Sequence, residues 1–105
     1  MDKTLKVEVS FQDELPKQVG SILKDVGATN VKELRQHGLT GIETVLVGIL
    51  VTSSLANLVI KLQRLWKCGV VVDARGSTVL TKKDCDLPRG TVLVISPNGV
   101  ESKLH

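Results

Sequence analysis

The chain has 105 residues and a formal net charge of +3, and its apolar content is mainly Val, Leu and Ile, which number 16, 15 and 5. This length allows one domain. So large a share of branched aliphatic residues excludes general disorder. One Phe, one Trp and no Tyr leave few rings for stacking on bases or sugars, and few of the aromatic anchors common in interfaces.

Apolar and polar residues alternate over residues 5–12, and this period of two predicts a strand with one buried face. A helical spacing of apolar residues follows and predicts an amphipathic helix over 14–26. Asp13 stands at its N-cap, Pro16 in its first turn and Gly27 at its C-cap. We expect a weaker strand over 30–36 and a loop over 37–41.

The segment from Ile42 to Lys67 has no charged residue between Thr44 and Ile60. Its first half, 45–51, is apolar throughout, whereas 54–65 is amphipathic. We favour one long helix, with a bend allowed at Thr52–Ser54. The β-branched residues of 44–51 leave an alternative, in which a strand over 44–51 precedes a helix that begins at Ser53 or Ser54.

The period changes again after Gly69. Residues 70–72 and 78–81 predict a hairpin around Gly76, and 84–90 form a polar connection. Residues 91–95 give the strongest strand pattern, followed by a turn at 97–99 and a short strand near 100–104. The fold class expected for the single domain 1–105 is α+β: strand, helix, strand and long helix, then an antiparallel meander of three to four strands, with one layer of helices on the sheet.

Residues that carry chemistry are sparse. His105 is terminal, so only His37 remains to pair with Cys68 or Cys85 in a nucleophilic site, and we favour a solvated loop histidine instead. The ligand pairs of a zinc site, the Gly turn and distal Glu of a calcium loop, and a GxGxxG or P-loop pattern are missing. We therefore expect no enzyme, no metal site and no cofactor.

Basic and acidic residues balance over 1–40, with a small basic excess in 41–67 and 68–105. A nucleic-acid binder usually carries a denser basic stripe, so nucleic acid is a disfavoured partner. Such a binder would use Arg64, Lys67, Arg75, Lys82, Lys83 and Arg89. The N-terminus lacks the apolar core of a signal peptide, and the two cysteines form no CxxC pair. We expect reduced thiols in a cytoplasmic protein, with one disulfide as the alternative.

The apolar segment is the main candidate for function, because a chain of this size rarely covers such a helix on every side. We expect a protein partner or a second copy to pack on it. The interface would comprise Val45, Val47, Ile49, Leu50, Val51, Leu55, Leu58 and Trp66. Arg64, Lys67 and Arg89 are the expected basic contacts to a partner. The alternative is that 42–60 spans the inner membrane as a helix in a small membrane-inserted effector.

The order of elements and two local patterns carry a resemblance. The patterns are the helix end Leu62-Gln63-Arg64-Leu65-Trp66-Lys67 and the strand Val70-Val71-Val72 after it. Over residues 5–80 this layout resembles the effector-associated constant component domains of bacterial conflict systems. The segment from Leu87 onward has no counterpart in that likeness. The resemblance implies a non-enzymatic adaptor in antiviral defence or signalling, placed beside variable effectors such as peptidase-like or nucleotide-dependent modules.

Overall fold

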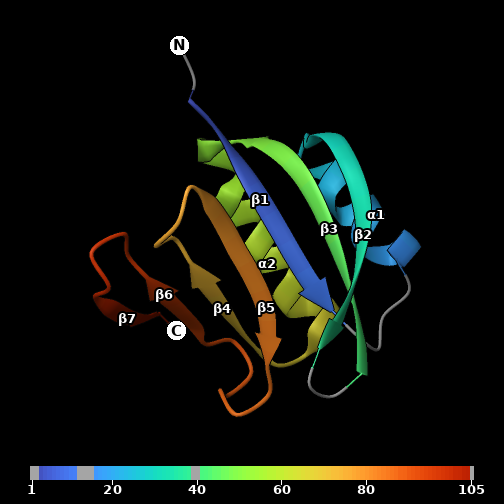
Figure 1. Cartoon of the computed structure of the whole chain (residues 1–105). Coiled ribbons are helices and arrows are strands. Elements are labelled where there is room, and N and C mark those ends of the chain that lie inside the picture. The colour runs from blue at the N-terminus through green and yellow to red at the C-terminus, as the bar shows by residue number, and fades with distance from the viewer. Residues whose placement is uncertain (1–2, 12–15, 39–40, 105) are drawn as a thin grey trace.

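The computed structural model describes residues 3–11, 16–38 and 41–104, and it is an α+β fold. Two helices lie on one face of a seven-stranded mixed sheet with the order β2-β3-β1-β5-β4-β6-β7 (Figure 1). The elements are β1 (Thr4–Phe11), α1 (Pro16–Asp25), β2 (Thr29–Gly38), β3 (Gly41–Val51), a 3₁₀ turn η1 (Thr52–Ser54), α2 (Leu55–Trp66), β4 (Gly69–Asp73), β5 (Thr78–Asp84), β6 (Val92–Ile95) and β7 (Glu101–Leu104).

The first strand and helix confirm the sequence prediction. Val7, Val9 and Phe11 of β1 are buried on the face that α1 covers. Gly27 ends α1 with φ of 87°, its N–H donates to the Lys24 carbonyl, and the Ala28 N–H donates to the Leu23 carbonyl. This pair of bonds is the Schellman motif, which needs a left-handed residue at that position. The predicted N-cap, Asp13, lies outside the described residues.

The long helix predicted over 42–67 is wrong, and its alternative is correct. Residues 41–51 form β3, which pairs antiparallel with both β1 and β2, and the helix begins only at Leu55. The loop expected over 37–41 is also largely strand, since β2 extends to Gly38 and β3 begins at Gly41. Positions 39 and 40 lie outside the described residues.

The position of β3 inside the sheet explains its uniform apolarity. Leu46 and Leu50 join the core cluster under the helices. Val45 and Val47 lie on the opposite face, where Val47 stands between Glu8 of β1 and Lys32 of β2, and both valines are still buried. A strand with buried side chains on both faces reads as a nearly continuous apolar run, and the sequence then resembles a buried helix.

Helix α2 is amphipathic, as the sequence predicts for residues 54–65. Leu58, Val59, Leu62 and Trp66 are buried, whereas Asn57 and Arg64 are exposed. The helix ends at Lys67, which takes a left-handed φ of 58° and donates its N–H to the Gln63 carbonyl. Twelve residues are too few to cross a bilayer. Within the described parts of the chain, no helix has the length and apolarity that a membrane span requires, so the predicted membrane helix over 42–60 is wrong.

The C-terminal strands are mixed rather than a purely antiparallel meander. β4 and β5 form the predicted antiparallel hairpin, and β6 pairs antiparallel with β7, but β6 runs parallel to β4 and β5 runs parallel to β1. The connection from β5 to β6 must therefore cross the start of β4. Leu87 in this connection lies so close to Gly69 that a Cβ there would stand 2.3 Å from the Leu87 Cβ, so only glycine fits.

A disulfide joins Cys68 and Cys85 at the same crossing, with their Cα atoms 4.8 Å apart. The expectation of reduced thiols is therefore corrected in favour of its alternative. The spacing of 17 residues carries no signature of a bond. The two cysteines meet because one precedes β4 and the other follows β5, and the antiparallel register brings Gly69 opposite Asp84.

Candidate interaction site

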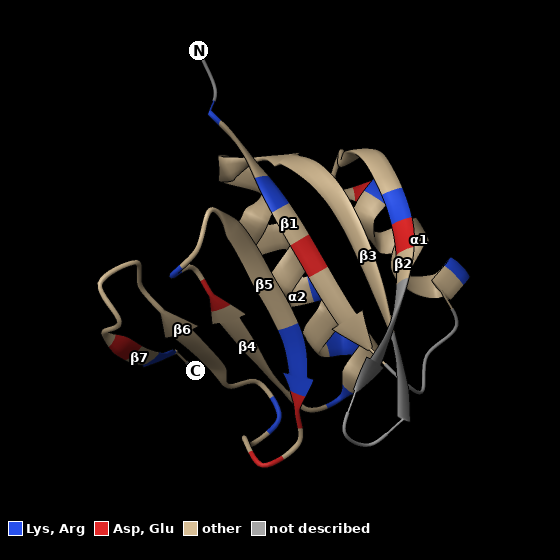
Figure 2. Ribbon diagram, in the orientation of Figure 1, with Lys and Arg blue, Asp and Glu red and all other residues tan. Residues whose placement is uncertain are grey.

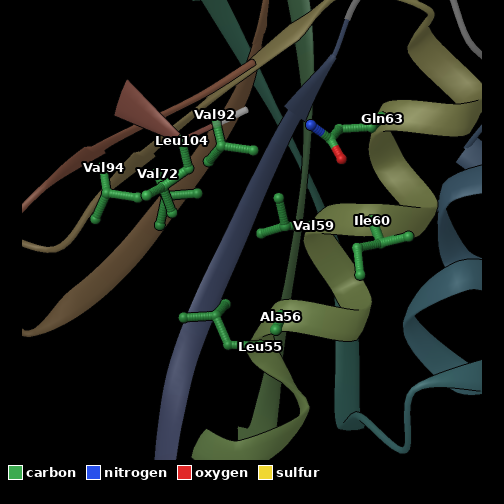
Figure 3. Close-up of a pocket in the computed structure, with 9 residues that line it drawn as sticks. All are labelled: Leu55, Ala56, Val59, Ile60, Gln63, Val72, Val92, Val94 and Leu104. Atoms are coloured by element: carbon green, nitrogen blue, oxygen red, sulfur yellow. The ribbon is translucent and has the colours of Figure 1, made fainter. Parts of the chain in front are cut away.

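An apolar groove lies between α2 and the end of the sheet formed by β6 and β7. Its volume is about 320 Å³, and apart from Gln63 its lining is apolar. One wall is helical and the other comes from three strands, as Figure 3 shows. We use the name apolar groove for this space, which is lined by Leu55, Ala56, Val59, Ile60, Gln63, Val72, Val92, Val94 and Leu104.

Exposed apolar side chains mark the rims of the groove. Ile60 of α2 is 45% exposed and Leu104 of β7 is 56% exposed. Val92 and Val94 on the floor are only half-buried, although they belong to the strand pattern that the sequence marks most strongly. The groove therefore lies on the face of the sheet that carries the helices, at a place where α2 does not fully cover the strands.

A smaller cavity of about 200 Å³ continues from one end of the groove, because Ile60 and Gln63 line both. Arg64, Arg89 and Gly90 complete its lining. The structure therefore brings together Arg64 and Arg89, two of the three predicted basic contacts, from segments 25 residues apart in the sequence. We name this space the basic cavity. The third predicted contact, Lys67, is exposed at the end of α2 and is not part of this lining.

A tight turn presents Arg89 to the basic cavity. The Thr91 N–H donates to the Pro88 carbonyl at 3.0 Å, and Gly90 has φ of 88°. This combination is a β-turn with glycine at the third position, where a positive φ is required. The close contact of Leu87 with Gly69 and the Cys68–Cys85 bond attach the turn to β4. Pro88 and Gly90 therefore shape the turn that leads into β6.

The residues predicted as an interface on 45–66 are mostly internal. Leu50, Leu58 and Trp66 belong to the core cluster, and Val45 and Val47 are buried on the opposite face of the sheet. Ile49 is 37% exposed on that opposite face, and Val51 is half-buried. Of the eight, Leu55 alone lines the apolar groove.

Sequence reasoning missed the strand wall of the groove. Val92, Val94 and Leu104 were assigned to strands, but none of them was predicted to line a binding surface. The missing information was how far the helices extend across the sheet. One signal was available: Ile60 lies between Ala56 and Arg64 at helical spacing, on the rim of the apolar face of α2.

The opposite face of the sheet carries charge between its apolar residues. A cavity there is lined by Lys6, Lys32 and Leu34 among others. At the β4–β5 turn, Arg75 binds Asp73 with an Nη2 to Oδ2 distance of 2.8 Å. The hydrogen bonds from the Arg75 side chain, then that from its backbone N–H, lower the pKa of Asp73 from 3.8 to about 2. Figure 2 shows charges of both signs scattered over the ribbon.

The groups available for catalysis are few in the described residues. No three His, Cys, Asp or Glu side chains lie close enough there to hold a metal ion. The two cysteines are joined in the disulfide, and the His37 side chain lies outside the described part.

The indole N–H of Trp66 is buried without a hydrogen-bond partner among the described residues.

Comparison of the chain with protein-family models, with curated proteins and with solved structures finds no match.

Proposed function

We propose that this protein is a non-enzymatic interaction module, an adaptor that docks a protein partner in the apolar groove. The observation that carries the proposal is the groove itself, which leaves an apolar space of about 320 Å³ open on the surface of a small domain. Surface apolar patches of this kind favour contact with another protein because their burial removes apolar area from water. The predicted docking through residues 42–66 is thereby narrowed to α2 and its neighbouring strands.

The two joined spaces favour a partner segment of defined chemistry. The apolar groove takes aliphatic side chains, and the basic cavity at its end places Arg64 and Arg89 beside them. A guanidinium group binds a carboxylate strongly because it donates two parallel hydrogen bonds. The expected partner is therefore an amphipathic segment with an acidic residue at one end.

The resemblance to effector-associated constant components gives the biological setting of the proposal. In that setting the protein belongs to a bacterial defence or signalling system and joins a variable effector. We propose the cytoplasm as its location. The Cys68–Cys85 bond favours an oxidising compartment instead. Alkylation of free thiols in intact cells, followed by mass spectrometry, distinguishes the cytoplasm from an oxidising compartment. Only in the cytoplasm would both cysteines be reduced and therefore alkylated.

The test uses proteins encoded beside this chain as candidate partners in calorimetric titrations. Two matched substitutions place a charge on equally exposed aliphatic residues: Ile60→Lys at the groove rim, 45% exposed, and Leu80→Lys on the opposite face, 42% exposed. We expect Ile60→Lys to weaken binding at least about tenfold and Leu80→Lys to leave it unchanged. Arg89→Glu should also weaken binding, because it reverses the charge at the basic cavity.

The proposal fails if Leu80→Lys weakens binding as much as Ile60→Lys does. It also fails if a partner binds the wild-type chain and the Ile60→Lys variant with equal affinity. Proton NMR spectra of both variants serve as the control for folding, since both positions are on the surface and should leave the core resonances in place.

A further inference from the structure

The outer edge of β7 has no partner strand among the described residues, because β7 is the last strand in the sheet order. We propose that a second copy of this chain pairs there, antiparallel, about a two-fold axis through Ser102. This inference goes beyond the proposed function, because it concerns the edge of β7 rather than the apolar groove. The dimer would be a continuous sheet in which the two β7 strands are central.

The register of the β6–β7 hairpin shows which backbone groups face the free edge. The Ser96 N–H donates to the Val100 carbonyl, and the strands pair Val94 with Ser102 and Val92 with Leu104. Hydrogen-bonded and non-hydrogen-bonded pairs alternate along an antiparallel ladder. Ser102 and Leu104 therefore bond towards β6, while the N–H and C=O groups of Glu101 and Lys103 point outward.

This alternation limits the registers that a second β7 can adopt. Outward residues must face outward residues, so the two-fold axis passes through position 101, 102 or 103. An axis through Glu101 or Lys103 sets a like charge directly opposite itself, which is destabilising. An axis through Ser102 sets Glu101 opposite Lys103 of the second copy, and Lys103 opposite its Glu101. The four residues of β7 are thus complementary in charge to themselves in one register (Figure 2).

In the same register, the residues that pair on the other face of the sheet are mainly apolar. Val100 and Leu104 are 57% and 56% exposed, the two largest exposures among the large hydrophobic residues of the described chain. In the register centred on Ser102, Val100 of each copy stands opposite Leu104 of the other. Leu104 also lines the apolar groove, so the grooves of the two copies would lie side by side. The contact thus joins two ion pairs on one face to two aliphatic pairs on the other.

The opposite edge of the sheet, β2, is irregular at its start. β2 departs from regular pairing with β3 between Thr29 and Lys32, and Asn30 has a left-handed φ of 54°. A bulge of this kind bends the strand and is a usual means of protecting an edge from pairing. The bulge interrupts the start of β2, whereas all four residues of β7 pair with β6 without a shift in register.

Charge reversal at the edge tests the proposal through the mass of the full chain in solution, measured by sedimentation equilibrium. In the proposed register, Glu101→Lys alone sets Lys opposite Lys, and Lys103→Glu alone sets Glu opposite Glu. We expect each variant to raise the dimer dissociation constant about tenfold or more. An equimolar mixture of the two variants, and the double variant Glu101→Lys with Lys103→Glu, should restore the wild-type constant. Lys17→Glu, an exposed reversal on α1, should leave it unchanged.

A wild-type chain that stays monomeric up to about 1 mM overturns the proposal, since specific contacts of weak affinity are still populated there. A dimer that tolerates both single reversals overturns it too, because another surface must then hold the copies together. Neither result bears on the docking of an effector in the groove, which the Ile60→Lys and Leu80→Lys variants test separately. Conversely, if Ile60→Lys and Leu80→Lys affect partner binding equally, the charge-reversal experiment still tests the dimer.

Discussion

The two ends of one sheet face differ in how completely they are covered. Between the sheet and the two helices, side chains such as Val7, Val9 and Leu62 have no exposed surface. At the β6–β7 end, Val92 and Val94 stay half-buried and the whole of β7 is exposed. Both regions carry aliphatic side chains on the helix-bearing face of the sheet, but in Figure 1 both helices lie to one side of the β6–β7 hairpin.

Simple dimensions account for the difference. Seven strands at a spacing of about 4.8 Å extend across about 29 Å. Two helices packed at about 10 Å each cover about 20 Å of that width. About two strands therefore remain beyond the helices, and these are β6 and β7. The comparison teaches that an apolar strand pattern predicts a buried face only where another element is wide enough to cover it.

The largest difference between the two regions is expected when one leucine in each is replaced by alanine. Leu62→Ala removes a fully buried side chain from the core cluster and should lower the free energy of unfolding by about 2–5 kcal/mol. Leu104→Ala removes one that is 56% exposed and should change it by less than about 1 kcal/mol. Urea unfolding of both variants measures this. Equal losses would mean that the β6–β7 end is covered after all.

The next largest effect on stability is expected from the Cys68–Cys85 disulfide, which lies where the chain crosses from β5 to β6. The disulfide closes a loop of 17 residues that contains β4 and β5, and its removal increases the freedom of the unfolded chain. Cys68→Ser with Cys85→Ser should lower the free energy of unfolding by about 3 kcal/mol. Unfolding of the wild-type chain with and without a reducing agent is the matched measurement. The double variant should show no response to the reducing agent.

The smallest effect concerns the β4–β5 turn, where the Ala74 N–H donates to the Ile95 carbonyl at the end of β6. Asp73 has a pKa of about 2 in the folded chain against 3.8 for the free group, chiefly through the hydrogen bonds of the Arg75 side chain. A lowered carboxyl pKa stabilises the fold above about pH 3.8, and this contribution is lost as the pH falls towards 2. Arg75→Gln should return the Asp73 titration, followed by carbon NMR of the carboxyl group, towards 3.8. An unchanged midpoint would place the cause elsewhere.

Local patterns predicted most elements of the fold. The strand over 5–11, the helix ending at Gly27, the β4–β5 hairpin and the last two strands all follow from alternation, helical spacing or turn residues. The failure at residues 42–54 has a physical origin. Periodicity cannot separate a buried helix from a strand covered on both faces, and the β-branched residues of 44–51 were the only local signal for the strand.

The candidate site was less accessible to such reasoning than the fold. Arg64 and Arg89 were each noted as basic contacts, but their meeting in one cavity depends on the crossing connection after β5. Three of the interface residues that proved buried, Val45, Val47 and Leu50, were chosen because a helix over 45–51 would have been apolar on every side. Leu58 and Trp66 do lie on a helix, but they belong to the core cluster. The wrong element type therefore moved the predicted surface into the interior.

Composition and local pattern were sufficient for a small α+β domain with an excess of aliphatic residues and few groups for catalysis. The place of that excess depends on contacts between segments distant in the sequence. The pairing of β3 with β1 and β2 buries the most apolar segment, and the parallel pairing of β6 with β4 sets two apolar strands beyond the helices. Side-chain order along a chain specifies which face of an element is apolar, whereas the relative widths of sheet and helix layer specify which of those faces stays open.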